Sequence, residues 1–476
     1  MEGGEQAFDF NALDRAASIA GEYLRAVRDR PVAPSPTALS DLAQFDGPLP
    51  ETPTNASAVV ELLGRIGSPG TVANAGGRFF GFVNGGALPV AVAATWIASA
   101  WDQNVALRVM SPTGAALEDV ALRWVGEALG LPPDCGGAIV TGASVANLTG
   151  LAAARHVLLQ RTGWDVENDG LFGAPQLTVV VSDQVHASLF KALGLLGLGR
   201  NRIIRVPTDE QGRMRVDSMP ALNDRTIVCI QAGNVNSGAF DPAKAICERA
   251  RDAGAWVHVD GAFGLWAAAS PRYRHLTEGF DMADSWATDG HKWPNVGYDC
   301  GIALVRKASA VQAAMSVSAA YFNPGILREP SNYTPEMSRR ARGVELWATL
   351  RCLGRQGLAD LIERTCRHAR RFADGLRESG YEILNEVVIN QVLVSFGEPE
   401  MTRAVIAQLQ ADGACWCGGT EWQGKAAMRI SVSSWATTNE DVEMSLSAMV
   451  RIAEECRKRS STGDTTENAN ERVQRL

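Results

Sequence analysis

Short runs of β-branched and apolar residues alternate with helix-length amphipathic segments between residues 137 and 306. Such runs have the length and composition of buried strands. They lie at 138–140, 177–181, 202–204, 226–230, 256–259 and 301–305, and a further apolar segment precedes Lys292. Because most of them are separated by enough residues for a helix, the pattern predicts an α/β domain with a mainly parallel sheet.

The segments on either side of this domain carry other patterns. Ahead of it, Ser111-Pro112 supplies an N-cap and a first-turn proline for an amphipathic helix that runs to Leu129. Behind it, we expect helices at about 340–379, 401–411 and 438–457, with strands at 381–384, 391–396 and within 414–433. The sequence therefore predicts a second, smaller α+β unit.

The two ends of the chain are thinner in apolar residues. About the first 60 residues have a helical pattern that prolines interrupt, and we expect them to pack on another subunit. The chain from Ser460 onward is polar and aperiodic, which is typical of disorder. We expect four regions: an N-terminal helical, dimer-swapped segment at 1–75, a large domain at 76–330, a small C-terminal domain at 331–458 and a disordered tail at 459–476.

Composition narrows the classes of function. The 476 residues include 45 Lys and Arg against 53 Asp and Glu, a net charge of -8, and no basic stripe, so we expect no nucleic-acid partner. No secretory signal or long apolar span is present, which predicts a soluble, cytoplasmic protein without a membrane partner. The nine cysteines are scattered and only Cys415 and Cys417 lie close together, so we expect reduced thiols and no metal site.

Ligands of α/β sheets bind at the carboxyl ends of strands, so the residues after each predicted strand are the first candidates. The turn at 141–144 leads from a strand directly into a helix, whose free N–H groups suit a phosphate. Ordinary capping of a helix after a glycine turn would leave the same pattern. The turn lacks GxGxxG and Walker spacing, which excludes a dinucleotide fingerprint and an NTPase loop.

Two further strand ends carry a histidine and an aspartate. His186 opens a helix, where its ring could lie over a bound heterocycle or could simply cap the helix. Asp260 ends a buried strand, and Gly261, Ala262 and Gly264 leave room beside it. A buried carboxylate requires a partner, which could be a protonated ring nitrogen, a helix start or a salt bridge.

The stretch SWATDGHKW, residues 285–293, places Lys292 among apolar neighbours. A desolvated lysine loses its proton readily and attacks carbonyl carbons, whereas a surface lysine would extend into water. A phosphate-binding turn, a ring-stacking histidine, a ring-nitrogen aspartate and an aldehyde-trapping lysine follow one another along the chain. Together they match the parts of pyridoxal 5′-phosphate.

Four motifs carry a resemblance to a known family. DQVHAS, HVDGAFG, DSWATDGHKW and GYDCG occur in this order, and the similarity runs from about Phe79 to about Val450. With them the sequence resembles the group II pyridoxal-phosphate-dependent amino-acid decarboxylases, and the aromatic-L-amino-acid members in particular. The resemblance implies fold type I, of the aspartate-aminotransferase kind, with a mainly parallel seven-stranded sheet. It also implies a homodimer with active sites at the interface and a swapped N-terminal segment.

The resemblance also implies roles for individual residues. Lys292 matches the Schiff-base lysine and Asp260 the partner of the pyridine nitrogen, while His186 and Ala262 match the residues on the two faces of the ring. The remaining cofactor-binding positions are Ala143 and Ser144 in the phosphate turn, His291 beside the lysine, and Asn234.

Tyr321, in AAYFNPG, matches a loop tyrosine that returns a proton to the substrate α-carbon in the family. Relatives with phenylalanine at this position tend to make aldehydes, so the tyrosine favours simple decarboxylation. Two departures stand out: Asp289-Gly290 replaces Asn-Pro before the His-Lys pair, and Asn234 and Asn236 replace threonines. The first puts a phosphate contact by residue 289 in doubt, and the second leaves a hydrogen-bonding role open.

The substrate pocket is predicted from the aromatic stretch at 76–83. Phe80, Phe82 and Trp101, with Phe322, would line it for a bulky apolar or aromatic L-amino acid, although the phenylalanines could equally belong to the core. Arg78 could instead pair with an acidic substrate. We expect decarboxylation to the amine and CO2. The alternatives are an aldehyde synthase, a carbon–carbon lyase, an aminotransferase and a non-catalytic cofactor-binding relative.

Overall fold

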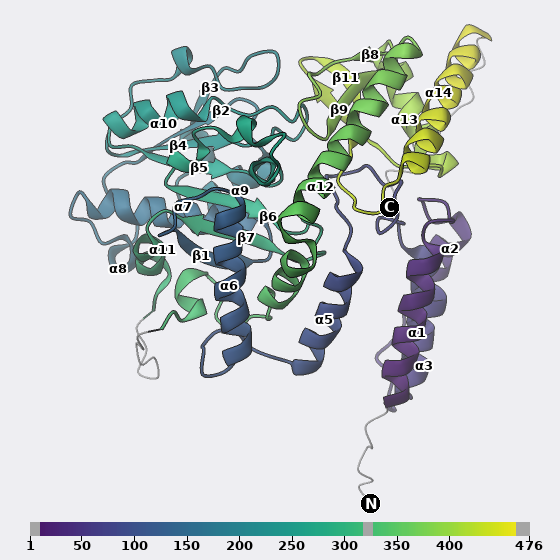
Figure 1. Ribbon diagram of the computed structural model, residues 1–476, viewed down its shortest axis with the longest axis horizontal. Coiled ribbons are helices and arrows are strands. Elements are labelled where there is room, and N and C mark those ends of the chain that lie inside the picture. The colour runs from purple at the N-terminus through teal and green to yellow at the C-terminus, as the bar shows by residue number, and fades with distance from the viewer. Residues whose placement is uncertain (1–9, 318–326, 463–476) are drawn as a thin grey trace, which may run out of the picture.

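The computed structural model describes residues 10–317 and 327–462, and its main feature is a seven-stranded sheet (Figure 1). The strands run in the order β1-β7-β6-β5-β4-β2-β3. All neighbours are parallel except β7, which is antiparallel to both β1 and β6. The strands are β1 Gly136–Val140, β2 Thr178–Ser182, β3 Ile204–Val206, β4 Thr226–Gln231, β5 Trp256–Asp260, β6 Ser285–Asp289 and β7 Gly301–Val305. This confirms the predicted α/β fold with a mainly parallel sheet.

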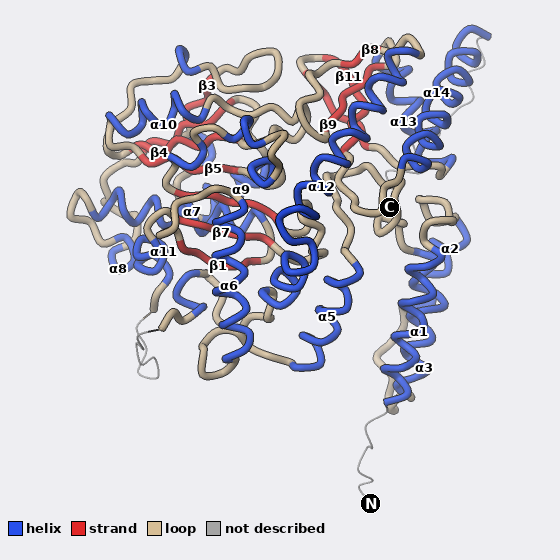
Figure 2. The backbone as a smooth tube through the Cα atoms, in the orientation of Figure 1, coloured by secondary structure: helices blue, strands red, loops and turns tan. Residues whose placement is uncertain are grey.

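Helices cover both faces of this sheet (Figure 2). Successive residues of a strand point to opposite faces, so Val179 and Val181 pack with α7 and α9 while Val180 belongs to the core on the other face. Burial on both faces explains why the strands read as nearly continuous apolar runs. The helices of this domain are α6 Pro112–Ala128, α7 Ala143–Gln160, α8 Val166–Asp169, α9 Ala187–Leu195, α10 Ala243–Asp252 and α11 Ala308–Met315.

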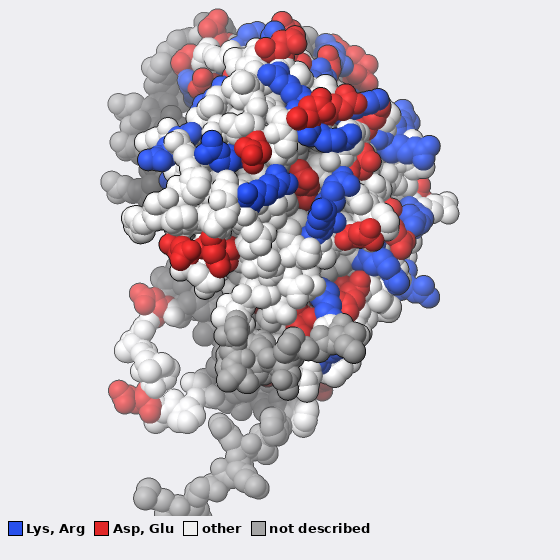
Figure 3. All heavy atoms as spheres, turned by 90° about the vertical axis from the view of Figure 1, so that its left-hand side faces the viewer, with Lys and Arg blue, Asp and Glu red and all other residues white. Residues whose placement is uncertain are grey.

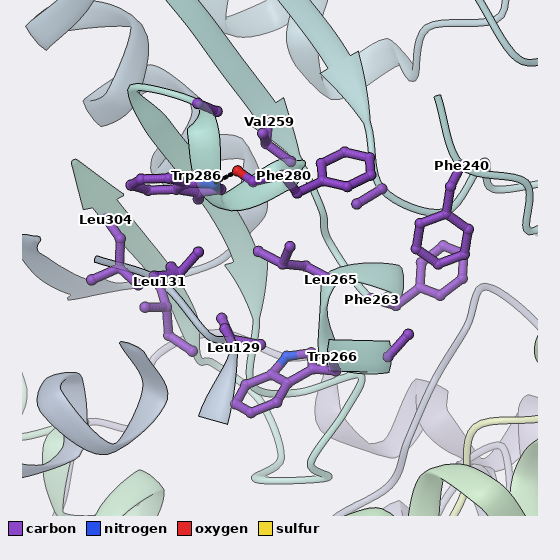
Figure 4. Close-up of a cluster of buried hydrophobic side chains, with 14 of the residues drawn as sticks. Leu129, Leu131, Phe240, Val259, Phe263, Leu265, Trp266, Phe280, Trp286 and Leu304 are labelled. Carbon is purple, nitrogen blue, oxygen red and sulfur yellow. Dashed lines mark hydrogen bonds between the residues drawn. The ribbon is translucent and has the colours of Figure 1, made fainter. Parts of the chain in front are cut away.

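The core on the second face contains large aromatic side chains (Figure 4). Trp286 of β6 donates its indole N–H to the carbonyl of Phe280 at 2.8 Å, and Trp266 donates to the carbonyl of Asp289 at 2.9 Å. The second bond joins the hydrophobic core directly to the carboxyl end of β6. Packing therefore fixes the backbone from which the lysine turn begins.

A smaller antiparallel sheet follows in the order β10-β11-β9-β8. Its strands are β8 Glu382–Ile383, β9 Gln391–Ser395, β10 Gly418–Trp422 and β11 Lys425–Ser431, and it packs with α13 Pro399–Asp412 and α14 Asn439–Thr462. The long helix α12, Gly343–Glu378, is kinked at Gly354, where φ is 58°. Its first part packs on α6 and on α5, Pro89–Trp101, and it also contacts α14 and β9.

Some predicted elements are displaced. The predicted strand at 202–204 begins as a short 3₁₀ turn at Arg200–Arg202, and β3 follows at Ile204–Val206 on the sheet edge. An edge strand pairs on one side only, so the apolar pattern defines its bounds poorly. The last helix continues to Thr462, and the rest of the predicted tail lies outside the described residues.

The N-terminal helices form an arm beside the two sheets. They are α1 Phe10–Ala26, α2 Pro36–Asp41, α3 Ala56–Leu62 and α4 Ser68–Gly70, and Figure 1 shows α1 and α3 side by side, away from the main sheet. No residue of α1 is buried. The arm therefore adds little to the core of the chain by itself.

Arg78 holds this arm to the smaller sheet. Its guanidinium donates to the carbonyls of Arg28 at 2.9 Å, Arg30 at 3.0 Å and Ala414 at 2.7 Å, and lies 3.9 Å from the Asp441 carboxylate. All of these partners are structural, and Arg78 is buried among them. The suggestion that Arg78 pairs with an acidic substrate is therefore wrong.

The surface carries no single-sign patch on the face drawn in Figure 3, where Lys and Arg alternate with Asp and Glu. Among the helices of residues 10–317 and 327–462, none is long and apolar enough to cross a membrane. All nine cysteines are unpaired, including Cys415 and Cys417.

A buried ion cluster braces α6 against β1. Glu118 of α6 lies 2.9 Å from Arg328 and 2.9 Å from Arg339, which also donate to the carbonyls of Gly137 and Ile139. Burial alone would raise the pKa of Glu118, but the two guanidinium charges outweigh it and hold the pKa below its usual range. The carboxylate is thus ionised, and it supplies a negative charge to both arginines.

We expect Glu118→Ala to lower the free energy of unfolding at pH 7 by about 3–5 kcal/mol, because it leaves the buried Arg339 without a counter-charge and Arg328 with Asp119 alone. A lowered folded-state pKa means that this contribution is complete above the unfolded value of about 4.3 and is lost as the pH falls through the folded value. Urea unfolding of the purified protein measures it.

The matched control is Glu127→Ala on the same helix, whose half-exposed pair with Arg355 spans 3.0 Å. Its loss should stay below about 1 kcal/mol. Equal losses for the two variants would contradict the role given to the buried cluster.

Candidate active site

The carboxyl ends of four strands meet at one edge of the large sheet. Val140 of β1 and Asp289 of β6 both pair with Gly301 of β7, which brings these two strand ends onto one row. A Cβ atom at Gly301 would overlap the backbone of Gly142, so only glycine allows the turn before α7 to approach so closely. This edge gathers most of the side chains that the sequence singled out.

Asp289 links the lysine to the start of α7. One carboxylate oxygen, Oδ1, accepts from the backbone N–H of Ala143 at 2.6 Å. The other, Oδ2, lies 2.8 Å from Nζ of Lys292 and 3.5 Å from Nε2 of His291. Asp289 is fully buried, and the N–H of Ala143 and the ammonium of Lys292 supply the partners that a buried charge requires. Residue 289 departs from the family motif, which put a phosphate contact by it in doubt, although its place at a strand end was a usable signal.

A hydrogen bond to a backbone carbonyl and a stacking contact orient the ring of His291. Nδ1 donates to the carbonyl of Cys300 at 2.9 Å, and the ring stacks on Tyr298 at 4.4 Å between centroids. Burial lowers the pKa of His291, although the nearby Asp289 charge opposes the shift. The ring is therefore neutral at neutral pH, with Nε2 facing Asp289.

Asp260 is buried at the end of β5 and is oriented by a chain of hydrogen bonds. Its Oδ2 accepts from Nδ2 of Asn147 at 3.3 Å, and Oδ1 of Asn147 accepts from Nε2 of His258 at 2.8 Å. The chain ends where Ser285 donates to Nδ1 of His258 at 2.8 Å. Burial lowers the pKa of His258 to about 3, so this histidine is neutral and its role is to orient Asn147.

No Lys, Arg or His side chain in the described part of the chain forms an ion pair with Asp260. A buried carboxylate without a counter-charge is costly, and a cationic ligand would relieve this cost. The neighbouring Asp289 differs in this respect, because Lys292 already pairs with it.

His186 caps the start of α9 as the sequence suggested. Its Nδ1 accepts from the backbone N–H of Ser188 at 3.2 Å, which leaves the proton on Nε2. His186 is exposed to solvent, and desolvation by the groups packed around its ring lowers its pKa. The charge of Asp260 opposes the shift, while Lys292 and Arg429 add to it. All three charges therefore act on one imidazole ring.

The other cofactor-site predictions lie around this centre. Ala262 accepts from the backbone N–H of Asp289 at 3.0 Å, and Ser144 is exposed at the start of α7 beside Ala143. The carboxamide oxygen of Asn234 is used inside its own loop, where it accepts from the N–H groups of Asn236 and Ser237 at 2.9 and 3.2 Å. Tyr321 and Phe322 lie outside the described residues.

The two phenylalanines predicted to line the substrate pocket lie in different environments. Phe80 is fully buried and packs edge-on against Phe372 in the core of the smaller sheet, so it is a core residue. Phe82 is 62% exposed, and its ring lies 5.3 Å from that of Trp416, which also stacks on Phe79 at 5.0 Å. Trp101 ends α5 half-exposed, and no contact found among the described residues joins it to Lys292.

Further residues reach the site from regions that sequence reasoning did not connect with it. Arg429 of β11 donates to Oδ1 of Asn236 at 3.3 Å, and burial lowers its pKa. Tyr298 donates to Oδ1 of Asn84 at 2.6 Å beside the His291 ring. Asn84 and Tyr298 are separated by more than 200 residues in sequence, so no local pattern could have joined them.

The comparisons with known proteins give one family. Residues 39–397 match the family model of the pyridoxal-dependent decarboxylase conserved domain. A tryptophan decarboxylase of Oryza sativa subsp. japonica is 28% identical over 465 residues, which cover 89% of each chain. An aromatic-L-amino-acid decarboxylase of Drosophila lebanonensis is 30% identical over 373 residues, covering 73% of this chain and 91% of that protein.

Solved structures share the fold. The crystal structure of Oryza sativa TDC with PLP and tryptamine matches with a TM-score of 0.86 at 24% identity, over 96% of this chain and 99% of that chain. A 4-hydroxyphenylacetaldehyde synthase of Rhodiola rosea matches with a TM-score of 0.82 at 21% identity, over 95% of this chain and 99% of that chain. The chain belongs to the pyridoxal-dependent decarboxylase family, and it is an amino-acid decarboxylase whose cofactor is pyridoxal 5′-phosphate.

Proposed function

We propose that this protein decarboxylates a bulky apolar or aromatic L-amino acid to the corresponding amine and CO2. The observation that carries the proposal is the meeting of Lys292, Asp260 and His186 at one sheet edge, where the lysine and aspartate charges both act on the histidine ring. An amine, a carboxylate and a flat neutral ring are the groups that a pyridoxal enzyme needs around its cofactor.

The donor set of the site fits the cofactor. Lys292 offers an amine for the aldehyde, and Asp260 is a buried carboxylate that still lacks a cationic partner. Ser144 and the first turn of α7 offer donors to a phosphate, next to the N–H of Ala143 that Asp289 already occupies. His186 and Ala262 would lie on the two faces of the ring. When bound, pyridoxal phosphate supplies the conjugated ring that takes up the electron pair left behind by CO2.

Each residue of the chain then has a distinct task. Asp260 favours the protonated form of the ring nitrogen, because a negative charge nearby stabilises a cation, and Asn147 keeps its carboxylate oriented. His186, neutral and protonated on Nε2, can donate a hydrogen bond from its ring to the substrate. Lys292 would hold the aldehyde group of the cofactor through Nζ, in the neutral form of its amine. The hydroxyl of Tyr321 would return a proton to the substrate α-carbon.

The aromatic cluster of Phe79, Phe82 and Trp416 supports an aromatic or bulky apolar substrate. The tryptophan and aromatic-L-amino-acid decarboxylases among the relatives support the same substrate class. Other relatives carry the names L-2,4-diaminobutyrate decarboxylase and acidic amino acid decarboxylase, so the family accommodates polar substrates too. Aldehyde formation is the second candidate, because the fold also matches an aldehyde synthase.

We also propose that the protein is a homodimer with its active sites at the interface. Trp96 and Ile97 on α5 are 46% and 51% exposed, and Leu13 and Leu63 on the N-terminal arm also face solvent. Large exposed apolar side chains such as the adjacent Trp96 and Ile97 are typical of interaction surfaces. A second copy of the chain would cover them.

Removing the ring-nitrogen partner tests the cofactor site. We expect Asp260→Ala to lower kcat by about a hundredfold or more, as loss of one preorganised electrostatic partner does. Some cofactor should remain bound, because Lys292 and the start of α7 are unchanged. Turnover and cofactor absorbance of the reconstituted protein measure the two effects.

The matched control is Asp284→Ala, which removes a carboxylate that accepts from the N–H of Val257 at 2.8 Å at the opposite end of β6. This variant should keep its turnover number even where it loses stability. Near-normal turnover of Asp260→Ala would refute the assignment of Asp260.

The reaction type is tested on the products. We expect the wild-type protein, incubated with a panel of L-amino acids, to release the amine and CO2 from aromatic or bulky apolar members. Tyr321→Phe should shift the product from amine toward aldehyde, because the proton donor for the α-carbon is gone. Mass spectrometry identifies both products, and an unchanged profile in the variant would remove Tyr321 from the mechanism.

The dimer is tested on α5. Trp96→Asp combined with Ile97→Asp should convert a dimer to a monomer in light scattering, because an interface cannot bury two unpaired carboxylates. Phe172→Asp is the matched control, since Phe172 is 99% exposed in a loop. A double variant with the mass of the wild type would show that α5 lies outside any interface.

A further inference from the structure

Asn295, three residues beyond Lys292, is fully buried and has a left-handed backbone with φ 69°. Asparagine tolerates this conformation better than most residues. Its carboxamide lies where three separate parts of the chain meet: the turn that carries Lys292, the stretch at 84–88, and the segment at 432–435 that follows the smaller sheet. One buried side chain thus lies in contact with three parts of the chain that are distant in sequence.

Its carboxamide connects the lysine to the smaller unit. Nδ2 donates to the backbone carbonyl of Lys292 and to that of Ser433 at 3.0 Å. Oδ1 accepts from the backbone N–H of Trp435 at 2.7 Å. Both amide hydrogens are therefore engaged, one on the lysine and one on the chain that leaves β11.

The stretch at 84–88 is hydrogen-bonded to both Asn295 and Trp435. The backbone carbonyl of Asn295 accepts from the N–H of Leu88 at 2.9 Å, and the indole of Trp435 donates to the carbonyl of Ala87 at 2.9 Å. A Cβ atom at Gly85 would overlap the carbonyl oxygen of Lys292 and the carboxamide of Asn295. The contact is so close that only glycine fits there.

We propose that Asn295 is a positioning residue that fixes the backbone of Lys292 relative to the smaller C-terminal unit. This inference rests on the proposed role of Lys292 as the residue that holds the cofactor. The lysine side chain is long and flexible, so the place of its Nζ depends on where its backbone is anchored. A displacement of about 1 Å at a reacting group can cost about a hundredfold in rate.

Asn295→Gly tests the inference, because glycine keeps the left-handed backbone while the side chain with its carboxamide is removed. Asn390→Ala is the matched control. Asn390 is also fully buried and donates to the same segment, at the carbonyl of Val432 (3.1 Å) and the hydroxyl of Ser433 (3.0 Å), but it does not contact Lys292. Both variants should unfold at lower temperature than the wild type.

The first readout needs no cofactor. In the apoprotein, amide hydrogen exchange in the peptide that spans residues 290–296 should speed up in Asn295→Gly and stay at the wild-type rate in Asn390→Ala. Asn295→Asp keeps the acceptor for Trp435 but loses both donors, to Lys292 and to Ser433. It should therefore resemble Asn295→Gly in this peptide.

The second readout uses the reconstituted protein. For Asn295→Gly we expect kcat to fall about tenfold or more with KM little changed. The pH midpoint of the cofactor absorbance should also shift, because it reports the environment of Nζ. Asn390→Ala should keep the wild-type midpoint and kcat. Equal behaviour of the two variants in exchange and in absorbance would overturn the inference.

Lys292→Ala distinguishes this failure from failure of the proposed function. If that variant loses the lysine-dependent absorbance while Asn295→Gly behaves like its control, only the role of Asn295 is wrong. If Lys292→Ala keeps the absorbance and the turnover, then Lys292 does not hold the cofactor, and both proposals are overturned.

Discussion

The site depends on one constraint, a carboxylate buried at the end of a central strand without a protein counter-charge. Asp260 can remain there because Asn147 donates to it and because His258 and Ser285 keep Asn147 in place. His258 must be neutral to act in this chain, and its burial ensures this by lowering its pKa to about 3. This chain of hydrogen bonds inside the sheet therefore holds the Asp260 carboxylate at the edge of the sheet without a counter-charge.

The second buried carboxylate shows how the chain distinguishes two acidic groups a short distance apart. Asp289 is fully paired, because it receives the N–H of Ala143 and the ammonium of Lys292. Asp260 is hydrogen-bonded but unpaired. Only the unpaired carboxylate would gain from a cationic ring, which is why the proposed function assigns the ring nitrogen to Asp260 and not to Asp289.

Much of this arrangement is readable from the sequence, for physical reasons. The strands of the large sheet are buried on both faces, so they appear as apolar runs, and the rule of strand ends led to His186, Asp260 and Lys292. The short edge strand β3 was misplaced because it pairs on one side only. Contacts between distant segments left no local signal: Arg78 with the N-terminal arm, Tyr298 with Asn84, and Asn295 with Trp435.

The two sides of the site are held by different kinds of interaction. The side that faces the sheet is fixed by buried hydrogen bonds to backbone groups, as at Asp289 and Asn295, and a change there disturbs the fold itself. Other side chains near the lysine turn are largely exposed, at 62% for Phe82 and 60% for Tyr298, which stacks on His291. Exposed side chains can be exchanged at little cost in stability. Under the proposed function, a fold of this kind would keep one cofactor chemistry while exposed residues such as Phe82 adapt to the choice of amino acid.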